Sequence, residues 1–185
     1  MNSSPNTTQN GFSYIDVMIA IVILSVGILA LLSALSASVL QARGESQQVK
    51  AKQIATSTME SILSVKETDP TRLGWNAIGN IGSNLDDDGI PHGIFPTGFQ
   101  SVLSDPGADE VIGTADDTGS AMQGFQRQIV VTDVCDPSRP SPICSPPGTS
   151  KIRFRTVEVT ITYFVGSLQR QEILRTVLTD YAVVN

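Results

Sequence analysis

The feature that most constrains this chain of 185 residues is a run of 26 consecutive uncharged residues, Val17–Ala42. The run consists mainly of Ile, Val, Leu and Ala, and it contains no Pro. A helix rises about 1.5 Å per residue, so this run would be about 39 Å long, whereas the hydrocarbon core of a membrane is about 30 Å thick. The run therefore predicts a helix that is long and apolar enough to span a membrane.

Three interpretations of this run compete. Uncharged apolar runs of this length rarely belong to the core of a soluble protein. A cleaved secretory signal has about 7–15 apolar residues behind a positively charged leader, but residues 1–11 contain no Lys or Arg. Residues 34–37 (ALSA) could nevertheless be misread as a small-residue signal cleavage site. We favour a retained membrane anchor over both alternatives.

The residues after the run predict an amphipathic helix. Apolar side chains recur at helical spacing on one face, and they are Ala51, Ala55, Met59, Ile62 and Val65. Pro70 disfavours a helical conformation in the residue before it, so we expect the helix to end there. We predict one long helix, or two nearly continuous ones, over residues 14–67, with a soluble domain packed on the second half.

The C-terminal third predicts strands, because Val, Ile and Thr are frequent and apolar residues alternate with polar ones. The expected strands are residues 126–134, 152–164 and 169–179, and Gly166–Ser167 is the expected hairpin turn. The first apolar residues of the second strand have the opposite parity to those after Thr156, which predicts a β-bulge there. An antiparallel sheet of at least three strands packed on the amphipathic helix makes the expected fold α+β.

Composition excludes several classes of function. The net charge is -6, so the chain lacks the clustered Lys and Arg that bind phosphates, and we expect no nucleic-acid partner. One His and two Cys cannot supply a four-ligand zinc site by themselves. No Gly-rich phosphate-binding loop follows a strand, and no Cys–His arrangement typical of catalysis is present. We therefore expect no enzymatic activity.

The junction between leader and anchor, Gly11–Val17 (GFSYIDV), resembles the class III signal of type IV prepilins. This resemblance implies that prepilin peptidase cleaves between Gly11 and Phe12 on the cytoplasmic face and that the new Phe12 amine is methylated. Residues 22–31 and 53–60 look like the two helical halves of PilV-type minor pilins, so the resemblance covers about residues 10–65. The chain departs from the family in its leader, which lacks Lys and Arg, and in Asp16, where the family almost always has Glu.

Asp16 is the acidic residue at the start of the apolar helix. An isolated carboxylate in such a helix is costly, and these residues are usually paired and functional. After the proposed cleavage, the obvious nearby cation is the Phe12 amine of the same chain or of a neighbour. We hypothesise that Asp16 selects the register at which subunits assemble. The alternative is a solvated Asp16 at the cytoplasmic interface.

Residues 74–119 form an acidic block with nine Gly, eight Asp or Glu, and no Lys or Arg. Oxygen-bearing side chains at alternate positions before a Gly are typical of the front half of a calcium loop, and the second acidic piece resembles loops of some pilins and pseudopilins. The candidate calcium ligands are Asn84, Asp86, Asp88, Asp105, Asp109, Asp116 and Asp117. The alternative is a solvated acidic loop held by Asp–Gly turns, without an ion. The concentration of negative charge without a basic partner supports calcium, but we weigh the loop without an ion slightly above it.

Cys135 and Cys144 bracket a Pro-rich loop between two expected strands. A disulfide would stabilise the fold by about 2–3 kcal/mol in the loop-entropy model. The alternative is two free thiols in a reducing compartment. We favour the disulfide and hence an oxidising compartment. The positive-inside rule gives the opposite orientation, because Arg43, Lys50 and Lys52 follow the apolar run.

These observations predict five segments. They are the leader 1–11, the membrane or filament-core helix 12–42, the amphipathic helix 43–69, the acidic region 70–124 and the sheet with its disulfide loop 125–185. The expected function is that of a minor pilin in type IV pilus assembly or priming, anchored once in the inner membrane with its C-terminal domain in the periplasm. The expected partners are prepilin peptidase, other pilin subunits and minor pilins. The alternatives are a minor pseudopilin of a type II secretion system and a membrane-anchored, calcium-dependent adhesion or binding module.

Overall fold

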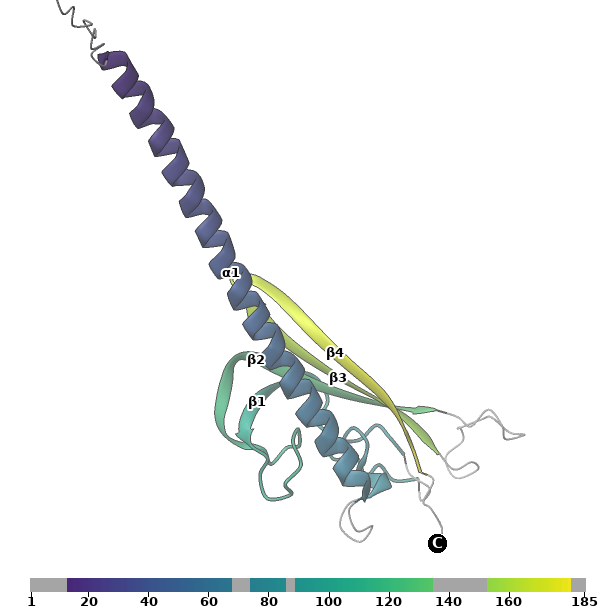
Figure 1. Ribbon diagram of the computed structural model, residues 1–185. Coiled ribbons are helices and arrows are strands. Elements are labelled where there is room, and N and C mark those ends of the chain that lie inside the picture. The colour runs from purple at the N-terminus through teal and green to yellow at the C-terminus, as the bar shows by residue number, and fades with distance from the viewer. Residues whose placement is uncertain (1–12, 68–73, 86–88, 135–152, 181–185) are drawn as a thin grey trace, which may run out of the picture. The chain divides into compact units, whose positions relative to one another are not determined.

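The computed structural model describes residues 13–67, 74–85, 89–134 and 153–180 (Figure 1). The described elements are helix α1 (Tyr14–Glu67), the 3-10 helix η1 (Trp75–Ala77) and the strands β1 (Gln100–Asp105), β2 (Thr118–Val134), β3 (Phe154–Val165) and β4 (Leu168–Thr179). The chain divides into two units, Met1–Arg43 and Gly44–Asn185. The predicted long helix over residues 14–67 is confirmed, and the fold is α+β as expected.

The first unit contains the apolar half of α1. Every described residue from 13 to 43 is exposed, including large side chains such as Leu31 at 72% and Ile23 at 66%. The hydroxyls of Ser25 and Ser36 donate hydrogen bonds to the carbonyl oxygens of Ile21 and Leu32, four residues back, at 2.7 and 2.9 Å. These two hydroxyls therefore have hydrogen-bond acceptors within the helix and do not require water as an acceptor. By length and composition, α1 fits a single membrane span or a signal sequence.

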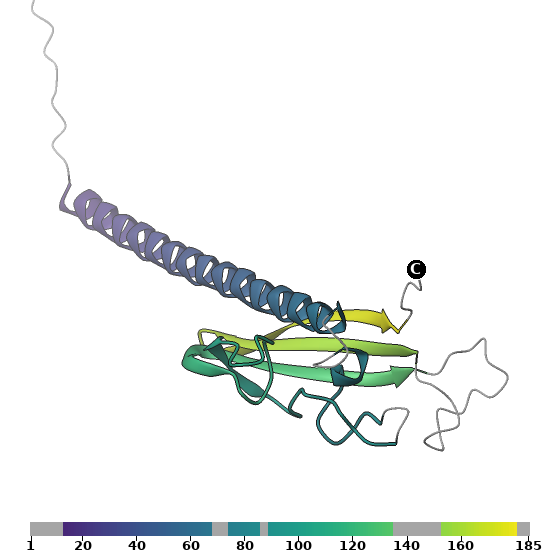
Figure 2. The same ribbon diagram turned by 90° about the horizontal axis from the view of Figure 1, so that it is seen from below.

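The second unit is the other half of α1 packed on a four-stranded antiparallel sheet in the order β1-β2-β3-β4, as the two views in Figures 1 and 2 show. The helix buries one face, made of Ala51, Ile54, Ala55, Thr58, Met59, Ile62 and Val65. This face includes every residue that the sequence predicted for it. The sheet contributes alternate residues to the same core, among them Ile129 and Val131 of β2 and Val157, Val159, Ile161 and Tyr163 of β3.

The helix approaches the β3–β4 hairpin closely at Gly44. A Cβ atom at this position would lie 3.2 Å from Cγ1 of Val165, the last residue of β3. The hairpin turn follows at Gly166–Ser167, as the sequence predicted, and Gly166 has a positive φ of 63°. Gly44 therefore has a packing role that offsets the cost of about 1 kcal/mol for Gly inside a helix.

The sheet differs from the prediction in two strands. β1 is an additional edge strand within the acidic block, and β2 begins at Thr118 rather than at residue 126. Strands β1 and β2 pair with two register shifts, between Ser101 and Leu103 and between Leu103 and Asp105. Irregular pairing between Gly-rich and polar segments leaves little periodicity in the sequence, which explains why these parts were missed.

The bulge predicted near Thr156 is wrong. Strand β3 pairs without a register shift with β2 from Phe154 to Tyr163 and with β4 from Phe154 to Val165. The buried parity runs through Arg155, Val157 and Val159, and Phe154 lies on the other face. The prediction failed because it assumed that an apolar residue and not Arg155 would occupy the core face.

Arg155 is completely buried because several groups surround its guanidinium. Nη1 donates to the carbonyl oxygens of Trp75 and Ile78 at 2.8 and 2.9 Å, and Nε pairs with Asp133 at 3.0 Å. The guanidinium carbon lies 4.9 Å from the centroid of the Trp75 ring. A buried charge is tolerated where it is paired and hydrogen-bonded in this way. Arg155 thereby joins the segment around η1 to the sheet.

Candidate functional site

The N-terminus of α1 carries the only candidate assembly residue that the structure describes, Asp16. Its Oδ2 accepts a hydrogen bond from the backbone N–H of Ser13 at 3.3 Å, while the N–H of Asp16 donates to the Ser13 carbonyl at 3.0 Å. This is the reach-back contact of a capping box, in which an acid in the first turn satisfies a free backbone N–H. Asp16 thus stabilises the start of its own helix. Gly11 and Phe12 lie outside the described residues, so their processing and the Asp16–amine pair stay predictions.

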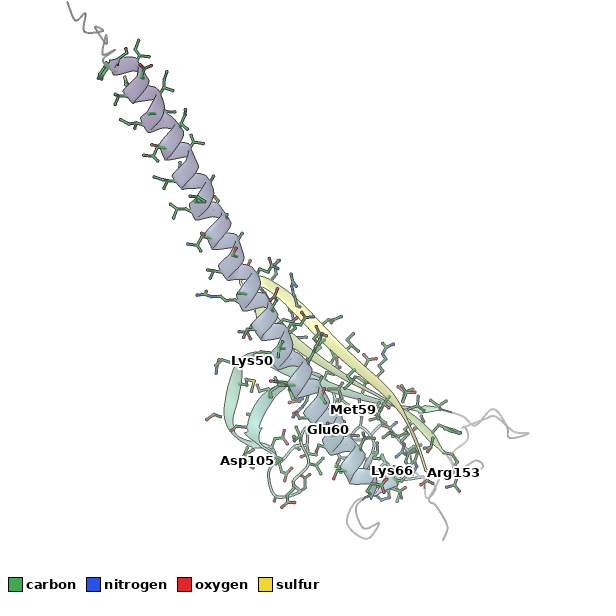
Figure 3. The ribbon with its side chains drawn as sticks, in the orientation of Figure 1. Lys50, Met59, Glu60, Lys66, Asp105 and Arg153 are labelled. Carbon is green, nitrogen blue, oxygen red and sulfur yellow. The ribbon has the colours of Figure 1, made fainter. Side chains whose placement is uncertain are left out.

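The acidic loop, defined here as residues 105–117, begins at the end of β1, where Asp105 is labelled in Figure 3. Asp105 Oδ1 accepts a hydrogen bond from the N–H of Gly107 at 2.9 Å. Gly107 has a φ of 76°, and a Cβ atom there would lie 2.3 Å from the carbonyl oxygen of Asp116. A side chain is therefore excluded at this position, and the loop closes tightly on itself.

Asp116 is the hydrogen-bond centre of the loop. Its Oδ2 accepts the N–H groups of Ala108 and Asp109 at 2.9 and 3.1 Å, and its Oδ1 accepts the Thr114 hydroxyl at 2.6 Å. The hydroxyl of Thr114, followed by the two N–H groups, lowers the pKa of Asp116 below its usual value. The carboxylate therefore remains ionised and organises the loop from within.

The pKa of the Asp109 carboxyl is shifted in the opposite direction to that of Asp116. Its Oδ1 accepts the N–H of Val111 at 2.8 Å, but partial burial raises the pKa of its carboxyl, and the neighbouring Asp116 raises it further. Ile112, which follows Val111 in the loop, donates its N–H to the hydroxyl oxygen of Ser61 on α1 at 2.9 Å. This bond attaches the loop directly to the amphipathic half of the helix.

Asp117 is tied to the core by a buried ion pair. Its Oδ2 lies 2.6 Å from Nη2 of Arg127 on β2, and the two side chains are only 6% and 2% exposed. Asp117 also accepts the N–H groups of Gly113 and Thr114 at 3.0–3.2 Å, and Nη1 of Arg127 lies 3.5 Å from the hydroxyl of Thr58 on α1. The ion pair therefore joins loop, strand and helix.

This pair corrects one premise of the calcium hypothesis. The acidic block contains no Lys or Arg, but Arg127, which lies outside the block, neutralises Asp117. Sequence reasoning missed Arg127 because it sits within an apolar strand, where a charge is expected on the solvent face. Arg127 is two residues from the buried Ile129 and four from the buried Val131, so it lies on the same face of the strand. This spacing is the signal in the sequence that places Arg127 on the core face.

Asn84, another candidate ligand, is also committed to the fold. It is 4% exposed, its Oδ1 accepts the N–H of Asn80 at 2.7 Å, and its Nδ2 donates to the Val131 carbonyl at 3.2 Å. The amide of Asn80 in turn donates to the Ile129 carbonyl and accepts the Val131 N–H, both at 2.8 Å. The two asparagines thus satisfy backbone groups of β2 beyond the point where β1 pairs with it.

The calcium hypothesis stays a prediction. Asp86 and Asp88 lie outside the described residues, as do Cys135 and Cys144, so the disulfide also stays a prediction. Among the residues that are described, no three His, Cys, Asp or Glu side chains gather as a metal site requires. In this part of the chain, the carboxylates of the acidic loop organise backbone N–H groups.

No protein-family model, no curated protein and no solved structure matches this chain at a significant level. The fold therefore has to be judged from its own features. A long apolar N-terminal helix, continued by a half that packs on a four-stranded antiparallel sheet, is consistent with a pilin-like fold.

Proposed function

We propose that this chain is a minor pilin, processed by prepilin peptidase and incorporated into a type IV pilus, or its assembly-initiating complex, through its N-terminal helix. The observation that carries the proposal is the division of α1 into two environments. One half is apolar all round and exposed in the isolated chain, and the other half is part of the core of a folded domain. A chain of this kind needs lipid or neighbouring apolar helices around its first half.

The sequence at the junction supports the specific class. Gly11–Val17 resembles the prepilin signal, and the acid at Asp16 stands at the fifth position after the proposed cleavage site. In the inner membrane the first half of α1 serves as the anchor, with the sheet domain in the periplasm. In the filament the same half packs against other pilin subunits, and the folded domain is carried outside.

Asp16 has two successive partners in this mechanism. In the chain as described, it caps its own helix through the Ser13 N–H. After cleavage, the free Phe12 amine offers a full positive charge, and a charged donor forms a stronger bond to a carboxylate than a neutral N–H does. Exchange of the capping bond for an amine of a neighbouring subunit stabilises the assembled state at one register.

Filament incorporation of Asp16 variants tests this function. The chain is expressed in a piliated host that lacks its own copy, and sheared filaments are analysed for it by immunoblot. We expect Asp16→Ala to leave the amount of processed protein in the membrane unchanged but to reduce its amount in filaments about tenfold or more, because the amine loses its partner. Asp16→Glu retains the carboxylate and is expected to assemble.

Two results would contradict the proposal. Wild-type chain that is absent from sheared pili but required for protein secretion would identify a pseudopilin instead. Equal incorporation of wild type and Asp16→Ala would remove the pairing mechanism, because a solvated Asp16 at the membrane interface predicts no difference.

A further inference from the structure

A shallow pocket of about 370 Å³ lies on the face of the sheet that points away from α1. Gln126, Thr162 and Phe164 line it, and they alternate along β2 and β3 with buried residues such as Arg127 and Tyr163, which face the helix. Small-molecule sites have volumes of about 300–1,000 Å³. The pocket is therefore large enough to hold a small ligand.

Thr162 places a buried hydroxyl in this pocket. The residue is 6% exposed, and among the described residues no group makes a hydrogen bond with its side chain. Buried polar groups in folded proteins nearly always have a hydrogen-bond partner. Thr160, which is equally buried on the same strand, donates its hydroxyl to Glu158 at 3.3 Å. The hydroxyl of Thr162 thus differs from that of its neighbour, because it is available to a ligand as donor and acceptor.

Thr162 belongs to a row of uncharged polar residues that crosses all four strands. Its register partners are Gln126 on β2 and Gln171 on β4, and Gln126 pairs in turn with Ser101 on β1. Every described residue that lines the pocket is uncharged. Hydroxyls and amides both donate and accept hydrogen bonds, whereas anionic ligands favour Arg or Lys and divalent cations favour carboxylates. The lining therefore favours a neutral, polar ligand.

A bulge in β2 adds apolar surface beside this row. Residues 122–125 of β2 lie opposite the single residue Val102 of β1, and Gly124 has a φ of 80°. The pairing of β2 with β3 ends just before Phe164. Met122 and Phe164 line the pocket at this end and are 44% and 52% exposed. Bulges of this kind re-aim side chains beside functional sites.

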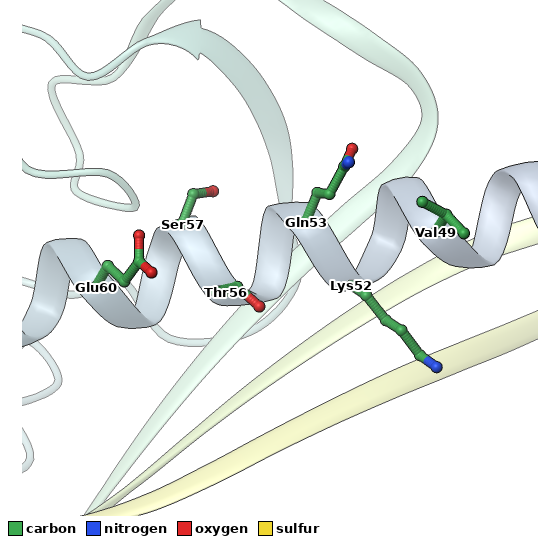
Figure 4. A pocket seen from close by; sticks show the side chains of 6 residues that line it. All are labelled: Val49, Lys52, Gln53, Thr56, Ser57 and Glu60. Atoms are coloured by element: carbon green, nitrogen blue, oxygen red, sulfur yellow. The ribbon is translucent and has the colours of Figure 1, made fainter.

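A hollow on the exposed face of α1 lacks this combination (Figure 4). All of its lining residues come from one helix, and each of them is exposed. Its Ser57 hydroxyl already donates to the carbonyl of Ile54 at 3.1 Å, and Lys52 and Glu60 give it charges of both signs. The buried hydroxyl without a partner therefore distinguishes the pocket on the sheet.

We propose that the pocket on the sheet binds a neutral saccharide. Sugar hydroxyls, like those of Ser and Thr, both donate and accept, so they match the hydroxyl of Thr162 and the amide of Gln126. The apolar C–H face of a sugar ring packs on Phe164 and Met122. A peptide strand fits less well, because strand addition requires a sheet edge and Thr162 lies on the inner strand β3.

Ligand-observed saturation-transfer NMR on the full-length protein tests this proposal. The protein is purified in a phosphocholine detergent, whose headgroup contains no sugar. The probes are maltose, cellobiose, lactose and N,N′-diacetylchitobiose at millimolar concentration, with 3′-sialyllactose as the anionic counterpart of lactose. We expect saturable binding of at least one neutral disaccharide and no preference for the anionic probe.

Two variants locate the bound sugar. Thr162→Val removes the hydroxyl and keeps the branched shape, so it is expected to weaken binding about two- to tenfold. Its thermal midpoint should not fall, because no described group of the protein bonds to this hydroxyl. Phe164→Ala removes the ring that packs on the sugar and is expected to weaken binding about three- to tenfold.

Thr132→Val and Phe99→Ala are the matched controls, because they make the same changes at exposed positions outside the pocket. Both are expected to bind as well as wild type. The proposal is wrong if none of the four neutral disaccharides binds, if 3′-sialyllactose binds more tightly than lactose, or if the control variants lose as much affinity as Thr162→Val and Phe164→Ala. Sugar binding involves only the sheet, so this result is independent of the cleavage and assembly that the proposed function requires.

Discussion

The two halves of α1 share one secondary structure but depend on different surroundings. Along the first half, every residue from 13 to 43 is exposed, although the run Val17–Ala42 has no charge. Along the second half, seven residues are buried and a polar face is left outside. Helix formation alone therefore says little about where stability comes from. The second half gains it from the sheet, and under the proposed function the first half gains it from lipid or from other helices.

The second unit also satisfies its own polar groups. Arg127, Arg155, Asn80 and Asn84 are buried, and each has hydrogen-bond partners within the described part of the chain. In the first half of α1, the hydroxyls of Ser25 and Ser36 bond within the helix and reach no other element. The comparison predicts that substitutions in the second unit change its folding stability, whereas substitutions in the first half change insertion and assembly.

The largest expected effect is at the buried ion pair. Arg127→Ala leaves Asp117 buried without its charge partner, and we expect the free energy of unfolding to fall by about 3–5 kcal/mol. Arg175→Ala is the matched control, because Arg175 pairs with Glu158 but its side chain is 66% exposed, and it should cost at most about 1 kcal/mol. Thermal unfolding of the full-length protein in detergent measures both. Equal losses for the two variants would contradict the role of the buried pair.

A matched pair of isoleucines tests the comparison of the two helix halves directly. Ile62 is completely buried, whereas Ile28 is 49% exposed. Ile62→Ala removes core contacts and is expected to lower the free energy of unfolding of the domain by about 2–5 kcal/mol. Ile28→Ala is expected to leave domain unfolding unchanged. A comparable shift in the unfolding transition of both variants would show that the first half is also part of the folded core.

Asn84→Asp separates a structural role from a calcium-binding role. Asp retains an oxygen for the Asn80 N–H but loses the donor to the Val131 carbonyl, so we expect a loss of about 1–3 kcal/mol with or without calcium. If Asn84 were a calcium ligand, the added charge would instead strengthen binding. Thermal melts with millimolar calcium and with chelator distinguish the two, and stabilisation of the variant by calcium alone would contradict the structural role.

Asp109 is expected to have the smallest effect, and its sign depends on pH. Because burial raises its pKa above the ordinary value of 3.8, the stability contributed by the protonated form is present below that value and is lost as the pH rises through the folded-state pKa. Asp109→Asn keeps the acceptor for the Val111 N–H, so it should stabilise the protein at pH 7 by less than about 1 kcal/mol. The gain should shrink as the pH falls toward 3.8. A variant that is less stable than wild type at pH 7 would contradict the claim that burial disfavours the ionised carboxylate of Asp109.

Most of the fold that could be predicted follows from the pattern of apolar residues in the sequence. The uncharged run and the helical spacing of Ala51–Val65 predicted the helix, and the alternation of residues in β3 predicted a strand. The structure confirms both elements. The predictions that were wrong concern features that depend on contacts between residues distant in sequence. Burial of Arg155 requires the carbonyls of η1 and the Trp75 ring, about 80 residues away, and no local pattern reveals them.

The acidic block shows the same limit for the candidate site. Its composition revealed a concentration of carboxylates, and Asp–Gly turns were recognised as an alternative to calcium. The position of Arg127 beside Asp117, and of Ser61 beside the loop backbone, follows only from the packing of β2 and α1. Composition therefore located the loop but not the groups that hold it.

The N-terminal residue of the mature protein, determined by mass spectrometry of the chain from membranes, tests the central claim most directly. The account predicts a chain that begins at methylated Phe12 and retains the whole apolar half of α1. A chain that still carries residues 1–11, or one cut near Ala37 and released from the membrane, would contradict it.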